Sequence, residues 1–412
     1  MERIILHCDM NNYYATVECM LNPVLRGKAV AVCGSQDDRH GIVLAKSEEA
    51  KKYGVNTGDV IWEARQKCSD LITVPPHFNE YAKYSKLARE IYYGYTDQIE
   101  PFGIDECWLD VTGSTRLFGD GCEIAYKIKE EIKSELGLTI SVGVSYNKIF
   151  AKLGSDLKKP DAITCINSEN FKDIVWTLPS NSLLGIGPAT KKKLANYKIH
   201  TIGDVANCSP SFLQRILGKN GEMLWVYANG LDTSRVMHSG YHVPIKSIGR
   251  GITCCEDLED DNEVWRVLLK LAQEVSSELR ENKLKATGVQ ISIRDKELKT
   301  AQFQAITDCP TQNAMDLALK AKEIFQQNYN WRKKVRAVTI RAINLQDERI
   351  PMQLDLFFNH EKHRKNDLIE RAMIEIRNKY GDDSITMATL MGDLKMSKIR
   401  QDISVLPNTM FK

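Results

Sequence analysis

The sequence predicts an α+β fold built from more than one domain. Two segments, roughly 1–147 and 244–346, show the element order β-α-β-β-α-β, which is the order of a ferredoxin-like domain. The stretch between them, roughly 167–232, has a mostly helical pattern. A chain of 412 residues has room for about two to four domains, so these three segments are expected to fold as separate units.

In the first segment, an apolar run indicates a short strand that ends on Asp9, and the residues after it have the pattern of a helix start. Between this helix and Pro76, turn signals separate several short elements. The expected elements of the segment are a strand at 3–10, helices at 11–20, 80–99 and 121–136, a hairpin at 98–111 and a strand at 138–147.

In the last segment, four runs read as strands: KSIGRGIT, GVQISIRD, TAQFQAIT and RAVTIRAINL. A helix after Asp261 has apolar residues at three- and four-residue spacing, and a second helix is expected at about 312–328. Residues 233–243 are expected to be a linker, and the charged tail 347–412 is only partly helical in pattern.

The bulk composition bounds the function. A net charge of +2 is too small to indicate nucleic-acid binding by itself, so any basic surface must be local. The eleven cysteines include no CxxC pair, which favours reduced thiols in a cytosol-like compartment. No apolar run approaches the length of a membrane span, so we expect a cytoplasmic protein with no membrane partner.

Two adjacent carboxylates, Asp105 and Glu106, lie inside an otherwise apolar hairpin. A buried carboxylate is costly unless it is paired or bound to a cation, and two neighbouring charges also repel. If the strands at 3–9 and 106–112 are neighbours, Asp9 joins them. Two divalent cations about 4 Å apart would then replace repulsion with ligation. Oxygen ligands favour Mg2+, with Mn2+ as a substitute.

A simpler interpretation of these acids also exists. Adjacent residues of a regular strand face opposite sides, so both can reach one site only if the strand starts or bends there. Gly103 is consistent with such a turn. Otherwise Asp9 is a helix cap and Asp105-Glu106 a hairpin tip. Spacing alone leaves both interpretations open.

Three blocks carry a resemblance to a known family: DMNNYYATVE, GIDECWLDVTGS and SVGVSYNKIFAKLGSDLKKP. In order and spacing they resemble the catalytic blocks of Y-family DNA polymerases, which are translesion enzymes. The resemblance implies a right-hand polymerase and template-directed transfer of dNMP to a primer 3′-hydroxyl. The short segment expected to form the fingers predicts low fidelity and damage bypass, and no segment indicates a proofreading exonuclease. The implied domains are a palm (1–20 and 77–166), fingers (21–76), a thumb (167–232), the linker (233–243), a little finger (244–346) and the tail.

The resemblance also implies the roles of individual residues. Tyr14 would be the steric gate, whose ring would clash with a 2′-hydroxyl. A core aromatic is the simpler reading of that tyrosine. The implied ligands of two Mg2+ ions are Asp9, the Met10 main-chain carbonyl, Asp105 and Glu106. The implied nucleotide-binding residues are Asn11, Asn12, Tyr13, Tyr14, Lys51 and Lys159.

The sequence departs from the family in its fingers. Glu48 stands where the family usually has a tyrosine, and Lys51 where it usually has an arginine. Lys51 keeps the positive charge but loses the bidentate fork. Glu48 would repel a phosphate unless it turns away, which puts the fingers' share of nucleotide binding in doubt.

Several basic or glycine-rich features are expected to hold DNA. The run 183–194 resembles a helix-hairpin-helix, in which backbone N–H groups approach a phosphate, although such a turn is common. Basic residues on the last predicted sheet suggest a surface laid across DNA backbone, although such runs are usually solvated faces. The candidate DNA-binding residues are Gly185, Gly187, Lys191, Lys246, Arg250, Arg332, Lys333 and Arg336.

The tail contains QLDLF at 353–357, which resembles the peptide by which bacterial polymerases dock on the sliding clamp. The alternative is an amphipathic turn that packs on the body of the protein. The candidate docking residues are Gln353, Leu354, Leu356 and Phe357.

The expected partners are therefore primer-template DNA, dNTP and a sliding clamp, for a monomer associated with the nucleoid in the bacterial cytosol. Two other classes of protein use some of these features. A metal-dependent nuclease would also cluster carboxylates on a sheet, but it would consume DNA without dNTP. A non-catalytic DNA-binding scaffold would have no need of three convergent acids.

Overall fold

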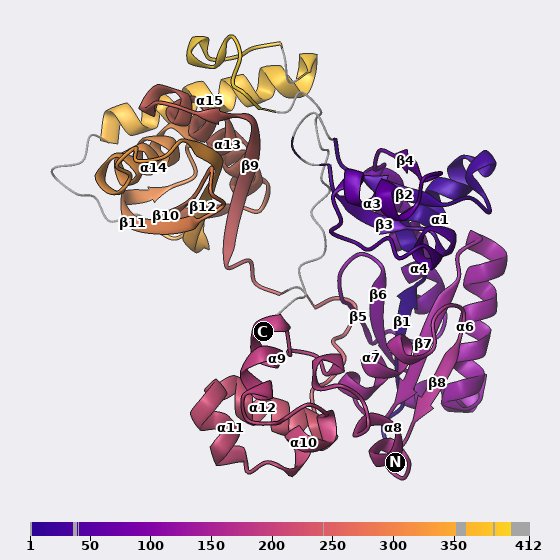
Figure 1. The fold of residues 1–412 in the computed structure, drawn as a ribbon. Helices are drawn as coiled ribbons and strands as arrows, with labels where there is room; N and C mark the ends of the chain where they lie inside the picture. The colour runs from indigo at the N-terminus through magenta and orange to yellow at the C-terminus, as the bar shows by residue number, and fades with distance from the viewer. Residues whose placement is uncertain are drawn as a thin grey trace. The chain divides into compact units, whose positions relative to one another are not determined.

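The computed structural model describes residues 2–35, 39, 41–241, 243–351, 360–381 and 384–396. The chain forms two compact units, shown in Figure 1. The first contains most of residues 2–243, and the second most of residues 244–396.

The first unit is organised around a five-stranded sheet in the order β5-β6-β1-β7-β8. The central strand β1 is antiparallel to both of its neighbours, and it places Asp9 directly opposite Glu106. The condition for Asp9 to join the other two acids, that the two acid-bearing strands are neighbours, is therefore met. The strands are β1 (Ile5–Met10), β5 (Ile99–Pro101), β6 (Glu106–Asp110), β7 (Ile140–Ser145) and β8 (Ile163–Ile166).

Three helices pack on one face of this sheet: α1 (Tyr13–Leu21), α4 (Phe78–Tyr93) and α6 (Gly121–Leu136). Every second strand residue points into this core, Leu6 and Cys8 among them, as a strand's two-residue alternation requires. The predicted helix at 121–136 is confirmed to the residue. A capping box between Asp120 and Glu123 fixes its start.

The opposite face of the sheet is approached by α7 (Lys148–Leu157). A Cβ atom at Gly143 of β7 would lie 1.9 Å from the Ala151 carbonyl oxygen, so only glycine permits this packing. The close approach brings Lys152 of α7 to the side of the sheet that carries Asp9 and Glu106. The glycine of the block SVGVS therefore determines which side chains meet the acids.

Within the same unit, residues 23–34 and 42–74 form a small subdomain with its own core. Its sheet has the order β3-β2-β4, with β2 antiparallel to β3 and parallel to β4. The elements are η1 (Pro23–Leu25), β2 (Val30–Cys33), β3 (Val43–Lys46), α2 (Glu48–Lys52), α3 (Ile61–Lys67) and β4 (Ile72–Val74).

The segment after β8 is helical, as its pattern predicts, and its core also includes apolar residues of α7. Its helices are α8 (Phe171–Val175), η3 (Ser180–Ser182), α9 (Pro188–Ala195), α10 (Ile202–Asn207), α11 (Pro210–Leu217) and α12 (Lys219–Ala228). Two short helices, η2 (Thr112–Ser114) and α5 (Thr115–Phe118), connect β6 to α6.

The second unit is a four-stranded sheet in the order β11-β10-β12-β9, in which all neighbours are antiparallel. The strands are β9 (Ser247–Leu258), β10 (Leu284–Asp295), β11 (Thr300–Thr311) and β12 (Val335–Asp347). Three of these strands contain a predicted run in full, and β9 begins at the second residue of KSIGRGIT. Helices α13 (Asp261–Glu281) and α14 (Ala314–Asn328) pack on one face of the sheet (Figure 1).

Part of the tail is more ordered than its pattern predicts. Helix α15 (His360–Tyr380) and the short η4 (Ala388–Leu390) belong to the second unit. The buried Glu370 of α15 accepts hydrogen bonds from the backbone N–H of Ala314 and the Ser276 hydroxyl. Arg280 donates to Asp367 at 2.7 Å. These long-range contacts attach a helix whose own sequence is highly polar.

One expectation from composition is wrong. Two exposed cysteines, Cys122 on α6 and Cys165 on β8, are joined in a disulfide, so not all thiols are reduced. Sequence spacing could not show this, because the two residues meet only when the helix packs on the sheet. Among the described helices, none is long and apolar enough to cross a membrane.

Candidate active site

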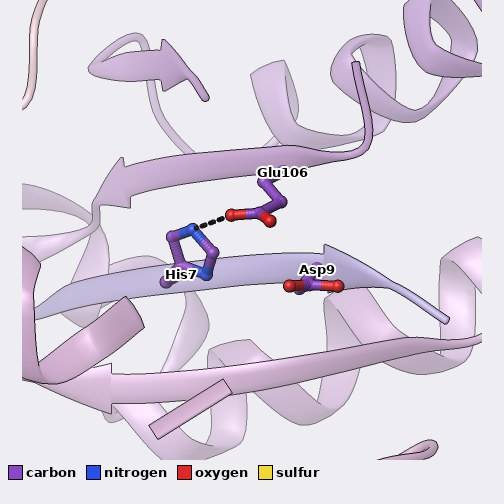
Figure 2. Close-up of side chains that lie close together, drawn as sticks. All are labelled: His7, Asp9 and Glu106. Atoms are coloured by element: carbon purple, nitrogen blue, oxygen red, sulfur yellow. Dashed lines mark ion pairs between the residues drawn. The ribbon is translucent and has the colours of Figure 1, made fainter. Parts of the chain in front are cut away.

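The three candidate acids lie at one end of the β1–β6 pair. Asp9 and Glu106 are cross-strand partners and therefore share a face of the sheet (Figure 2). Asp105 is the last residue before β6, and its carbonyl accepts the Met10 N–H at 3.1 Å. The turn before it contains Gly103 at φ 85°, a conformation that favours glycine. Because the strand begins at Glu106, strand alternation does not force Asp105 and Glu106 apart.

The electrostatics of Asp105 indicate an excess of negative charge. Burial, and next the carboxylates of Asp9 and Glu106, raise the pKa of Asp105 to about 7. A carboxyl group with so high a pKa has a neighbourhood that disfavours its ionised form. A bound divalent cation would reverse that preference, so this donor set fits one.

His7 is a further member of the cluster. Its ring is fully buried, and its Nε2 atom lies 3.2 Å from Oε2 of Glu106 (Figure 2). His7 Nδ1 lies 2.8 Å from the Ser155 hydroxyl oxygen, and that hydroxyl donates to the Lys152 carbonyl. A neutral ring carries a single N–H, so it donates either from Nδ1 to the Ser155 hydroxyl or from Nε2 to Glu106. Burial lowers the pKa of His7 well below its ordinary value, which favours this neutral ring.

Two lysines lie against the acids. The Lys152 ammonium nitrogen is 2.8 Å from Glu106 and 3.1 Å from Asp9. The Lys159 nitrogen is 2.7 Å from Asp9 and 2.8 Å from Asp156. Against the effect of burial, Asp9 raises the pKa of Lys159, which keeps this side chain charged. Two ammonium groups thus face the three candidate acids and Asp156, so negative charge remains in excess.

The structure changes two details of the expected nucleotide pocket. The Asn11 N–H donates to the Thr139 carbonyl, and its side chain bridges Ser141 and the backbone of Asp161. The ring of Tyr13 is buried in the core. Neither group is therefore presented to a triphosphate as expected. The backbone at the start of α1 can still contact a triphosphate, because the first N–H groups of a helix have no acceptor within the helix.

The Glu48 carboxylate contacts the side chains of Asn12 and Lys51. Its Oε1 atom accepts a hydrogen bond of 2.9 Å from the Asn12 amide and lies 3.3 Å from the Lys51 ammonium nitrogen. Burial opposes it, but the Asn12 hydrogen bond and the Lys51 charge hold the pKa of Glu48 below its ordinary value. The carboxylate is thus ionised, and Lys51, the expected phosphate contact, is beside it.

The candidate hairpin motif has the expected local form. Gly185 has φ 93°, and Gly187 directly precedes α9, which has a proline at its start. Lys191 is exposed on the same helix. Free N–H groups and positive charge at a helix N-terminus are the elements of a phosphate site.

The basic candidates of the second unit fall into two groups. Lys246, just before β9, and Arg332 are exposed, and Arg336 is half-buried. Arg250 is bound to Glu278 of α13 at 2.7 Å, and Lys333 is paired with Glu297. The last two side chains would have to leave these ion pairs to reach DNA.

Sequence reasoning missed the open face of this sheet. Arg341 of β12 is the cross-strand partner of Gln290 on β10, and Arg294 follows on the same strand at the same two-residue phase. Both arginines are exposed, whereas the intervening Ile291 and Ile293 are buried on the helix side. The alternation in VQISIRD was the available signal.

Two residues at the acids were also missed. His7 lies two positions before Asp9 in a strand and so shares its face, a signal that was available. Lys152 is a charged residue in a mostly buried helix within the third block. The candidate clamp residues 353–357 lie outside the described residues.

Comparison with known proteins agrees with this architecture. Residues 8–156 match the model of the impB/mucB/samB family, residues 245–356 match that family's C-terminal domain, and residues 181–232 match the thumb domain of DNA polymerase-iota. The chain is 50% identical over 399 residues to a DNA polymerase IV of Acetivibrio thermocellus, covering 97% of this chain and 100% of the relative. It is 37% identical to DNA polymerase IV 1 of Bacillus subtilis, covering 92% and 91%.

A solved structure extends the comparison to the fold. A chimeric Y-family DNA polymerase superposes with a TM-score of 0.75 at 25% identity, covering 84% of this chain and 99% of the other. The chain therefore belongs to the Y family of translesion DNA polymerases and is similar to bacterial DNA polymerase IV. It is an enzyme, a DNA-directed DNA polymerase.

Proposed function

We propose that this polymerase transfers nucleotides by a two-metal mechanism at Asp9, Asp105 and Glu106, and that it copies damaged templates with low fidelity. The observation that carries the proposal is the cross-strand pairing of Asp9 with Glu106, beside an Asp105 whose pKa is raised to about 7. Such a set of oxygen donors, joined by the Met10 carbonyl, suits Mg2+, and Mn2+ as a substitute. Two such ions would activate the primer 3′-hydroxyl and neutralise charge on the departing pyrophosphate.

The chain's own residues would orient the nucleotide. Lys159 would leave Asp9 and bind phosphate oxygens as a point charge. The N–H groups at the start of α1, at Asn12 and the two residues after it, would face the triphosphate. The Tyr14 ring would exclude a ribonucleotide by contact with its 2′-hydroxyl.

Grip on DNA would come from backbone contacts rather than base reading. Backbone N–H groups of the Gly185–Gly187 hairpin, together with the Lys191 ammonium group, would bind phosphates of the DNA duplex. On the second unit, Lys246, Arg332 and the open-face arginines Arg294 and Arg341 would contact the backbone. We do not assign Arg250 or Lys333 to DNA contact while they remain in their ion pairs.

Primer extension tests the site. Wild type should extend a primer with Mg2+ and dNTP on undamaged and abasic templates. Asp105→Ala should not, while Asp110→Asn, on the same strand, should extend normally. Tyr14→Ala should begin to incorporate ribonucleotides. If Asp105→Ala retains wild-type extension, the metal-ligand assignment is wrong.

The same reactions address fidelity and proofreading. We expect frequent misincorporation with single dNTPs, and no shortening of a mismatched primer when dNTP is withheld. Shortening of the primer by wild type would contradict the absence of an exonuclease.

Clamp docking through 353–357 is proposed separately. Binding a clamp would raise the effective concentration of a weakly gripping enzyme on DNA. Leu356→Ala with Phe357→Ala should shorten products on clamp-loaded templates and leave products on bare templates unchanged. An equal effect on both templates would remove the clamp from the proposal.

A further inference from the structure

A buried acid on α1 is not used by the proposed chemistry. The side chain of Glu18 is only 4% exposed. It belongs to α1, which packs on the face of the sheet opposite to α7. A carboxylate so deeply buried must be satisfied by hydrogen bonds. The Glu18 carboxylate contacts one side chain of α4 and the side chain of the residue that precedes α4.

The first partner is Tyr81, whose hydroxyl donates to Oε1 of Glu18. The second is His77, the residue that precedes α4. Its Nδ1 atom lies 2.9 Å and 3.0 Å from the two oxygens of Glu18. The His77 backbone N–H also donates to the Tyr81 hydroxyl at 3.1 Å. The hydroxyl end of Tyr81 is thereby fixed from two directions.

The ring of Tyr81 packs against Tyr14, the candidate steric gate. The rings of Tyr14 and Tyr81 are stacked, with centroids 4.1 Å apart and planes inclined by 10°. Phe78 contacts the Tyr14 ring edge-on, at 6.1 Å and 89°. Tyr14 and Glu18 are four residues apart on α1, so they project from the same side of the helix. Tyr14 contacts the face of the Tyr81 ring, and Glu18 contacts the hydroxyl of the same side chain.

We propose that Glu18 is a positioning residue for sugar selection, which fixes the Tyr81 ring through its hydroxyl and so provides the rigid surface on which the Tyr14 ring is stacked. A Tyr14 ring on a movable support could retreat from a 2′-hydroxyl. On a fixed support it cannot. The inference rests on the proposed role of Tyr14 as the steric gate.

A merely structural role predicts something different. If the contact only fastens α1 to α4, its loss should lower stability and slow deoxynucleotide and ribonucleotide incorporation equally. A positioning role should change their ratio. The informative measurement is therefore kcat/KM for dNTP divided by kcat/KM for the matching rNTP, together with Tm.

Two substitutions each remove the hydrogen bond between Tyr81 and Glu18, one at the donor and one at the acceptor. Tyr81→Phe keeps the stacked ring and deletes only the hydroxyl, and Glu18→Ala deletes the acceptor. Each should lower the dNTP-to-rNTP ratio by about three- to tenfold, the effect of losing part of a hydrogen bond to a charged group. Catalysis with dNTP should remain near wild type. Glu18→Gln, which keeps an oxygen acceptor for the hydroxyl, should restore most of the ratio.

Tyr95→Phe is the matched control. It removes a tyrosine–carboxylate hydrogen bond of 2.6 Å, to Glu131, within the same unit. Its ratio should equal that of wild type. If Tyr95→Phe lowers the ratio as much as Tyr81→Phe, general loosening explains the effect and the inference is wrong.

Tyr14→Ala separates this inference from the proposed function. If Tyr14→Ala does not admit ribonucleotides, the gate itself is misassigned and the inference falls with it. If Tyr14→Ala admits them while Tyr81→Phe keeps the wild-type ratio, the gate stands and the positioning role of Glu18 is wrong. Should Glu18→Ala fail to fold, Tyr81→Phe alone decides.

Discussion

The ammonium nitrogen of Lys159 lies 2.7 Å from Oδ2 of Asp9. The side chain proposed to bind triphosphate is thus held by a carboxylate proposed to bind metal. A cation bound at Asp9 would free Lys159 for the phosphates. A triphosphate bound to Lys159 would in turn free Asp9 for the cation. The pair therefore couples the two binding events.

Replacement of Lys159 tests this coupling. Lys159→Ala should lower kcat/KM for dNTP by about ten- to a hundredfold, because a hydrogen bond to a charged phosphate is lost. It should also tighten Mg2+ binding in the absence of nucleotide, because a competing cation is removed from Asp9. Steady-state kinetics and Mg2+ titration measure the two effects. Lys133→Ala, which removes a surface ion pair with Asp161, should change neither.

Lys152 should be needed for stability when metal is absent. Its ammonium group is the nearest positive charge to Glu106, at 2.8 Å among the described contacts, and its side chain is only 13% exposed. Lys152→Ala should destabilise the EDTA-treated protein by about 2–4 kcal/mol, because buried carboxylates lose their partner. Added Mg2+ should recover more stability in the variant than in wild type. Equal Tm values for the two proteins in EDTA would contradict this account.

Asp105 predicts a dependence of stability on pH. Its folded pKa, about 7, lies above the unfolded value of about 3.9. The folded state therefore holds the proton more tightly, and the metal-free protein loses stability as pH rises from about 4 to about 7. Asp105→Asn should remove this loss and raise Tm in EDTA at pH 8, with a difference that narrows as pH falls toward 4. A lower Tm for Asp105→Asn at pH 8 would show that the carboxylate is stabilising.

Much of this fold follows from local patterns. An apolar run predicted the strand that carries Asp9, and apolar residues at three- and four-residue spacing predicted the helix after Asp261. The position of Asp9 opposite Glu106 was expected only on the condition that their strands are neighbours, because carboxylates repel unless a cation joins them. The predicted strands and helices depend on residues that are close in sequence.

Contacts that depend on close approach of distant elements were not predictable in the same way. Lys152 meets the acids only because Gly143 admits α7 against the sheet. The polar helix α15 is held against α14 by Glu370, which accepts a hydrogen bond from the backbone N–H of Ala314. Neither partner could be chosen from many lysines and glutamates by spacing alone.

Glu48 is expected to weaken nucleotide binding. It lies 3.3 Å from Lys51 and would compete with phosphate for that side chain. Glu48→Gln should lower KM for dNTP by about two- to fivefold, since the pair is partly exposed and worth no more than about 1 kcal/mol. Lys51→Ala should raise KM, and the double variant should resemble Lys51→Ala. If Glu48→Gln lowers KM equally in the Lys51→Ala background, Glu48 acts directly on the nucleotide instead.

The open face of the second unit's sheet predicts a salt dependence. Arg294 and Arg341 are exposed on the face that α13 and α14 leave uncovered, at the same phase as Gln290. If each contacts one phosphate, their joint replacement by alanine should lower the slope of log affinity against log salt by about 2. The loss should be similar for unrelated DNA sequences, because backbone contacts do not read bases. Lys322→Ala with Arg371→Ala, on α14 and α15, is the charge-matched control and should leave the slope unchanged. A control slope that falls as far as that of the Arg294/Arg341 variant would show that total charge, rather than this face, determines the affinity.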